Sequence, residues 1–216
     1  MLLYTADKLR TRAPLLATFL FIASTGLCNA KQSTTITAQD VDSVFNSLGA
    51  MDWKTVEQLS GQLVQRDSPA QRNLIGRLRY IYIFSIAKQI ESKAIAYEDI
   101  KRRLAIVEGK LVVQPWHPIN TETRTCFNQI CVSADRPHTL YTAQTDNNGT
   151  LIYSFEYFDI GRPIDISSYN GQNARLGGIL EGVDVNQNIQ NAEKESSGVS
   201  WFLQLNIKDS FIHFVR

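Results

Sequence analysis

The sequence predicts an α+β fold, in which N-terminal helical hairpins of about four helices precede a mostly antiparallel small β-barrel or β-sandwich. Apolar residues recur at helical spacing up to about residue 109. From there to the C-terminus, aromatic and alternating runs are broken by Asn, Gly, Pro and Asp, as is typical of strands and turns. The composition, with 44% hydrophobic residues and ten Phe, indicates a folded chain. We therefore expect a cleaved signal peptide at 1–30, a helical domain at 31–109 and a β domain at 110–216.

Residues 14–28 form an uncharged apolar run that three basic residues precede and the small residue Ala30 closely follows. These are the three parts of a secretory signal peptide, so we expect the mature chain to be periplasmic or secreted. A retained membrane anchor is an alternative, although the run is shorter than the roughly 20 residues of a membrane span. Lipidation of Cys28 is another, but Leu27 is not the small residue that bacterial lipid attachment requires before the cysteine.

The charge of the mature chain limits its partners. Without residues 1–30, which hold three basic residues and one acid, the chain has 19 basic and 20 acidic residues. Binding of nucleic acid or of an acidic membrane requires clustered Lys and Arg. We therefore expect no nucleic-acid partner, and contact with a membrane only through the signal segment if it is retained.

Two helices are expected first. Thr37, with Asp40 three residues later, resembles a capping box that opens a helix ending at Gly49. Asp52 is placed to cap a second helix. Apolar residues at helical spacing mark one side of each helix: Val41, Val44, Phe45 and Leu48 in the first, and Trp53, Val56, Leu59 and Leu63 in the second.

A long helix and a shorter one are expected next. Residues 68–71, Ser-Pro-Ala-Gln, carry a start signal for a helix that runs to about Glu91. Its middle, 78–90, is too apolar for a surface helix, so we expect it to be central and covered by helices on more than one side. A fourth helix, 97–108, ends at Gly109.

The segment from Asp52 to Pro69 resembles the second helix of a tetratricopeptide repeat over eighteen residues. If the resemblance is meaningful, it implies a peptide-binding groove in the helical half. Ordinary helical hairpins give the same pattern, and no second copy follows at the repeat's period of about 34 residues.

The sequence of the second half of the chain predicts strands. A short run at 111–113 precedes two prolines, and 139–145 and 150–158 are joined by Asp-Asn-Asn-Gly, which is a strong hairpin signal. The turn at 208–210 is expected to join the last two strands, and 184–198 to be an exposed loop. The other expected strands are 175–180, 199–207 and 211–215.

Cys126 and Cys131 are the two cysteines of the mature chain, and an even number in an oxidising compartment favours a disulfide. If Asn128 and Gln129 are the central residues of a two-residue hairpin loop, the cysteines face each other across it. The closed loop is short, so reduction is expected to change the melting temperature little.

No pattern indicates a catalytic, cofactor or metal site. His117, His138 and His213 lack metal-ligand spacing, and the sequence has no nucleophile elbow. An acid pair that meets only in space, from Glu156, Asp159 and Glu181, is a further hypothesis, although ordinary solvated acids are commoner. The candidate binding residues are Trp116, His117 and Arg162, because they are large or charged groups in loop contexts. Alternatively, Trp116 fills the seam between the two halves.

We therefore expect a non-enzymatic exported protein that binds another protein or a peptide in the cell envelope. The alternatives are a small-ligand carrier that uses the β domain or the domain seam, and a hydrolase whose site the sequence does not reveal. An apolar cavity would favour the carrier, and a concave helical face with exposed aromatic residues would favour the partner. Histidines and acids that converge in a cleft would favour the enzyme.

Overall fold

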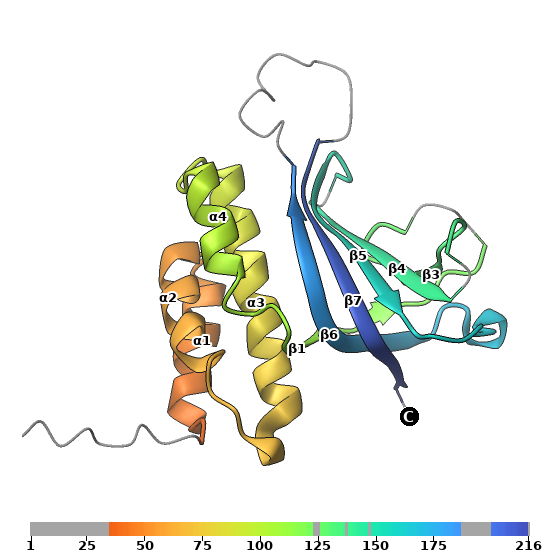
Figure 1. Ribbon diagram of the computed structural model, residues 1–216, viewed down its shortest axis with the longest axis horizontal. Helices are drawn as coiled ribbons and strands as arrows, with labels where there is room; N and C mark the ends of the chain where they lie inside the picture. The colour runs from red at the N-terminus through yellow and green to blue at the C-terminus, as the bar shows by residue number, and fades with distance from the viewer. Residues whose placement is uncertain (1–34, 123–125, 137, 147, 187–199, 216) are drawn as a thin grey trace, which may run out of the picture. The chain divides into compact units, whose positions relative to one another are not determined.

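The computed structural model describes residues 35–122, 126–136, 138–146, 148–186 and 200–215, which belong to one compact unit (Figure 1). The predicted signal peptide with Cys28, and most of the loop expected at 184–198, lie outside these residues. Within the described residues, four α-helices and a mixed seven-stranded sheet confirm the α+β class. Within the described part, no helix is both long and apolar enough to cross a membrane.

The first two helices begin where the capping residues predict. Helix α1 (Ala38–Gly49) has a full capping box, in which Thr37 Oγ1 accepts from the Asp40 N–H at 3.2 Å and Asp40 Oδ2 accepts from the Thr37 N–H at 2.9 Å. Helix α2 (Trp53–Leu63) starts at Asp52, whose carboxylate accepts from the Thr55 N–H at 3.1 Å. These bonds satisfy backbone donors that the first turn of a helix leaves free.

The start of the long helix differs from the prediction. Pro69–Gln71 forms a 3₁₀ turn, and α3 (Arg72–Glu91) begins only after it. The side chain of Gln71 bonds to the backbone N–H and C=O of Ile36, both at 2.7 Å. It is therefore not available to fold back over the helix start. Helix α4 (Tyr97–Leu104) ends before the predicted residue 108, and the chain turns at Gly109, whose φ is +71°.

Helix α3 is central, but the sheet supplies part of the cover that we expected from helices. Helix α2 packs on one side of α3, and strand β1 (Leu111–Val113) packs on another. The approach to β1 is close, since a Cβ placed on Gly76 would lie 2.7 Å from Val113 Cγ2. A larger residue at position 76 would push α3 away from the sheet.

The sheet has the order β1-β6-β7-β5-β4-β3, and β2 also pairs with β6 (Figure 1). Strands β5 and β7 run parallel, and every other described pair is antiparallel. The remaining strands are β2 (His117–Pro118), β3 (Cys131–Val132), β4 (Thr139–Thr145), β5 (Leu151–Asp159), β6 (Asn173–Val185) and β7 (Ser200–Phe214).

The prediction of a barrel or sandwich is wrong, because the described strands form one sheet that is not closed. In the described residues, an isolated bridge between Ile119 and Ile130, and no continuous ladder, links the segments next to β2 and β3. Pro115 and Pro118 lack an N–H, so this edge cannot carry a continuous ladder.

The turn predicted at 208–210 is also wrong, since β7 continues through it. Ile179 pairs with Lys208 and Gly177 pairs with Phe211, so Asp209 and Ser210 together lie opposite Gly178. This extra residue is a β-bulge, and Asp209 adopts a φ of +48° within it. Asp and Gly therefore mark a bulge here, although the same residues are common in turns.

The hairpin predicted at 139–158 is confirmed. Asp146 follows β4, and its carboxylate accepts from the N–H groups of Thr150 and Leu151 at 2.8 and 3.1 Å. Burial alternates only weakly along both strands, because most of their side chains are buried whichever face of the sheet they lie on.

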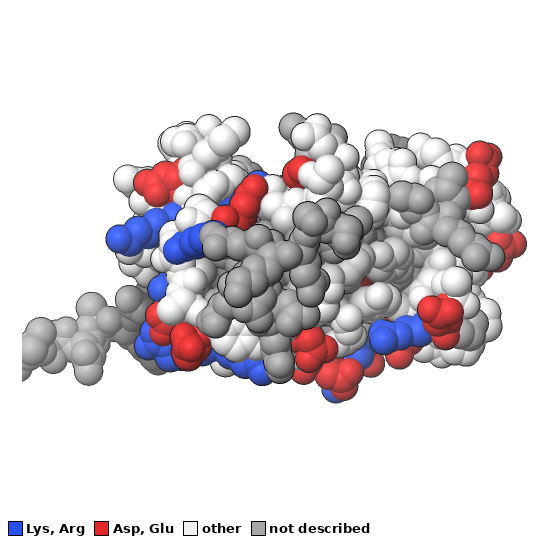
Figure 2. Space-filling view, turned by 90° about the horizontal axis from the view of Figure 1, so that it is seen from above, with Lys and Arg blue, Asp and Glu red and all other residues white. Residues whose placement is uncertain are grey.

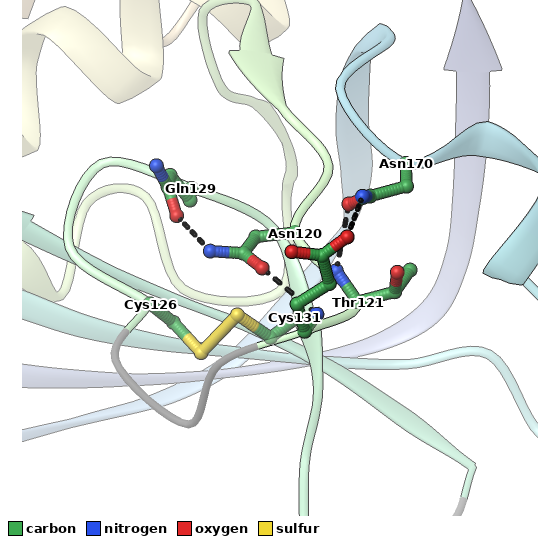
Figure 3. Close-up of a disulfide and its surroundings, with 7 residues drawn as sticks. Asn120, Thr121, Cys126, Gln129, Cys131 and Asn170 are labelled. Carbon is green, nitrogen blue, oxygen red and sulfur yellow. Dashed lines mark hydrogen bonds between the residues drawn. A yellow bond between two sulfur atoms is a disulfide. The ribbon is translucent and has the colours of Figure 1, made fainter.

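A disulfide joins Cys126 and Cys131, but the geometry predicted around it is wrong (Figure 3). The Gln129 N–H donates to the Cys126 carbonyl, so the central turn residues are Phe127 and Asn128. Asn128 has a φ of +51°, which Asn tolerates better than most residues. Cys131 pairs with Tyr141 of β4 instead of pairing with Cys126 as a hairpin neighbour.

Candidate ligand-binding site

Helices α1 and α3 meet strand β1 and strand β4 around a cavity of about 250 Å³. Most of its wall is apolar. It is lined by Phe45 and Leu48 of α1, Arg77, Tyr80, Ile81 and Phe84 of α3, Val113 and Pro115 at the end of β1, and Gln144 of β4.

The helical wall follows from the spacing of residues along α3. Positions 77, 80, 81 and 84 are separated by three or four residues, so their side chains share one face of the helix. Phe45 of α1 is 40% exposed, and Leu48, Ile81 and Phe84 are half-buried. The cavity is therefore an apolar groove that opens to solvent beside α1.

A buried carboxyl group lies behind Tyr80. The Tyr80 hydroxyl donates to Glu156 Oε1 at 2.7 Å, and the Ser154 hydroxyl donates to the same oxygen at 2.8 Å. Glu156 has no exposed surface. Burial raises the pKa of Glu156 to about 7, although the hydrogen bonds from Tyr80 and Ser154 oppose this. Burial, followed by the charge of Glu156, raises the pKa of Tyr80 well above its ordinary value.

The second oxygen of this carboxyl group faces a different environment. Glu156 Oε2 is buried and makes no hydrogen bond with the described residues, and the same holds for Thr142 Oγ1. Thr142 of β4 lies directly opposite Glu156 of β5. The protonated form of Glu156 suits this place, because a buried charged oxygen without a donor is costly.

A buried imidazole lies behind Gln144. The Gln144 side-chain amide, assigned as donor, is 2.9 Å from His117 Nε2, so this ring nitrogen is the acceptor. His117 is 7% exposed, and burial lowers its pKa to about 4, while a hydrogen bond with the backbone of Asn128 opposes the shift. The candidate binding residue His117 is therefore neutral near pH 7, and it bonds to a wall residue of the cavity.

Trp116 and Arg162 lie in different surroundings. Trp116 is 42% exposed, and the Arg175 guanidinium lies over its ring, 4.2 Å from the centroid. Trp116 therefore does not fill the seam between helices and sheet, which was the alternative prediction. Arg162 is exposed in the segment that follows β5, at the opposite end of the β4–β5 hairpin from Gln144. The structure does not bring it to the cavity.

The residues considered for an enzyme are dispersed. Asp159, Glu181, His138 and His213 are exposed, whereas Glu156 and His117 are buried. Glu156 is thus not the solvated acid that we expected. In the part of the chain that the structure describes, no three His, Cys, Asp or Glu side chains are grouped as metal ligands.

The sequence did not single out Tyr80 or Gln144. Tyr80 lies in a long apolar helix, where any residue can be core. Ser154, Glu156 and Phe158 alternate along β5, and this alternation was the available signal that Glu156 shares a face with a core phenylalanine.

Comparison of the chain with protein-family models, with curated proteins and with solved structures found no significant match.

Proposed function

We propose that this protein is a non-enzymatic exported protein that binds a small, largely apolar molecule in the cavity between α1, α3 and the sheet. The observation that carries the proposal is the cavity itself, with its apolar wall on α1 and α3. Ligand sites in proteins are concave and mostly apolar, with a few polar groups that fix the orientation of the ligand. The polar residues of this wall are Arg77, Tyr80 and Gln144.

The placement of the titratable groups favours binding over catalysis. General acid–base catalysis requires a side chain within hydrogen-bond reach of the reacting group. Glu156 has no exposed surface, and His117 lies behind Gln144. A molecule in the groove would meet Tyr80 and Gln144, whose polar atoms already bond to these two residues.

The volume limits the occupant. The cavity, at about 250 Å³, is just below the usual range for drug-sized ligands, which starts at roughly 300 Å³. Because the groove is open beside α1, a longer molecule could lie with one end in solvent. We therefore expect a small ligand or the apolar end of a larger one.

Binding of a neutral fluorescent probe, N-phenyl-1-naphthylamine, tests the proposal. We expect saturable binding of one probe per chain, which Ile81→Asp weakens more than tenfold because it places a charge in the apolar wall. Met51→Asp is the matched control, since Met51 is 72% exposed and does not line the cavity. Circular dichroism establishes that both variants are folded. Absence of saturable binding, or equal binding by the Ile81 variant, would contradict the proposal.

Binding of a protein or peptide from the cell envelope is the second candidate. It is favoured by Phe45 and Trp116, which are 40% and 42% exposed and lie next to the cavity, Phe45 in its wall and Trp116 beside Pro115. Large exposed aromatic residues are common in the centre of protein interfaces. A photo-crosslinking residue at position 45 should then capture one defined partner in the native envelope, while the same residue at position 51 should not. Identical products from both positions would argue against a specific partner.

A further inference from the structure

One arginine lines the groove, and a second lies over a tryptophan next to it. Arg77 is part of the cavity wall, one helical turn before Ile81. Arg175 of β6 lies over Trp116, which follows the cavity residue Pro115. The two guanidinium groups are near enough that, after burial, the charge of Arg77 is the second cause that lowers the pKa of Arg175. Arg77 thus brings a positive charge into the wall of an apolar groove, and Arg175 brings a second one next to Trp116, from a different element.

Neither arginine has a counter-ion among the described residues. The ion pairs found there involve Arg66, Lys88, Arg102, Arg103 and Lys208. Arg175 Nε is buried and makes no hydrogen bond within the same residues. Neighbouring like charges without an acid destabilise each other, and an anion bound between them would remove that repulsion.

The chain has no general excess of positive charge. On the face that Figure 2 shows, acidic and basic side chains are intermixed, without a patch of one sign. The mature chain as predicted is close to neutral. A general attraction for anions is therefore not expected, and the arginine pair would act locally.

We propose that the cavity binds an amphipathic anion, with an alkyl or aryl tail along α3 and a carboxylate, sulfate or phosphate head between Arg77 and Arg175. This rests on the proposed function, because it names the class of ligand for the same cavity. Arg77 and Phe84 are seven residues apart on one helix face, a rise of roughly 10 Å, which suits a medium-length alkyl chain. Guanidinium groups bind such heads in a bidentate manner, and Trp116 holds the plane of Arg175 in place.

Three probes with the same tail separate the head from the tail: decanoate, decan-1-ol and decyltrimethylammonium. Each is titrated as a monomer against the full protein, by displacement of the naphthylamine probe. We expect decanoate to bind at least about tenfold more tightly than decan-1-ol, and the cation to bind most weakly. The preference for decanoate should shrink at high salt, because partly exposed charges are screened.

The variants Arg77→Gln and Arg175→Gln should each reduce the affinity for decanoate by about tenfold, and should reduce the affinity for decan-1-ol much less. Arg77→Lys should retain part of the preference, since it keeps the charge but loses the planar fork. Arg72→Gln is the matched control on the same helix, because Arg72 is exposed and does not line this cavity.

The outcomes distinguish the two proposals. If the neutral probe and decan-1-ol bind but decanoate has no advantage, the anionic ligand is wrong while the apolar cavity stands as the site. The same conclusion follows if Arg77→Gln and Arg175→Gln bind decanoate no more weakly than the control Arg72→Gln does. If none of the probes binds, the ligand-binding function itself is overturned.

Discussion

Two buried pairs behind the cavity wall use the same arrangement with opposite electrostatic results. In one, Tyr80 of the wall bonds to Glu156, and in the other, Gln144 of the wall bonds to His117. Both titratable groups are almost fully buried. Burial raises the pKa of the carboxyl group to about 7 and lowers that of the imidazole to about 4.

The comparison shows that burial favours whichever form of a group is neutral. A carboxyl group is neutral when protonated, and an imidazole is neutral when deprotonated. Between about pH 4 and about pH 7 neither group carries its full charge. Glu156 and His117, which lie behind the cavity wall, therefore carry little charge in this range. This suits an apolar ligand in the groove.

The largest expected effect concerns the dependence of stability on pH. This dependence should have opposite signs in a variant that lacks Glu156 and in a variant that lacks His117. The raised pKa of Glu156 contributes stability that is fully present below its unfolded value of 4.5 and is lost as the pH rises through about 7. The lowered pKa of His117 contributes stability that is present above 6.5 and is lost as the pH falls through about 4. Each contribution amounts to about 3 kcal/mol, so their opposite dependences on pH nearly cancel in the native protein.

Urea unfolding at about pH 4.5 and about pH 7.5 measures this. Glu156→Gln should be less stable at the acid end, because only the His117 contribution remains. His117→Asn should be less stable at the neutral end. The exposed residues Glu181 and His213 supply controls, as Glu181→Gln and His213→Asn should follow the native protein. Parallel slopes in the Glu156 and His117 variants would refute the assignment.

A smaller effect is expected from the wall residues themselves. Tyr80→Phe removes one of the two donors to Glu156 and should destabilise the fold by about 2 kcal/mol above pH 7, where the carboxylate is charged. Gln144→Leu removes a bond to a neutral ring and should cost about 1 kcal/mol at the same pH. Thermal unfolding at both ends of the pH range measures both. If the Tyr80 variant loses no more stability at high pH than at low pH, the Tyr80 hydroxyl does not stabilise the charged form of Glu156.

The helical half was largely predictable because its signals are local. The capping residues Thr37 and Asp52 bond to backbone groups three residues away, so the sequence contains both partners. The start of α3 was predicted wrongly for the opposite reason. Gln71 bonds to Ile36, thirty-five residues earlier, and no local pattern shows that partner.

The sheet and the site depend on such distant partners throughout. The strand at 200–214 was divided in two because Asp209 and Ser210 resemble a turn, whereas pairing with Gly177 and Ile179 makes them a bulge. Tyr80 and Glu156 are seventy-six residues apart, and Gln144 and His117 twenty-seven. Their pairing follows from the way in which α3 and the segment 114–117 pack on the sheet. Composition and spacing do not reveal this packing.

The smallest expected effect links the buried Tyr80–Glu156 pair to the two arginines. If an anion binds beside Tyr80, ionisation of Glu156 places a negative charge behind the wall, and the affinity for decanoate should fall by a few-fold as the pH rises past about 7. Decan-1-ol should show no such fall. Glu156→Gln should bind decanoate equally on both sides of pH 7, because the amide does not ionise. Calorimetric titration of both ligands measures this, and a fall that persists in the Gln variant would show that Glu156 is not its cause. Because linkage is reciprocal, decanoate should also raise the pKa of Glu156 in the native protein.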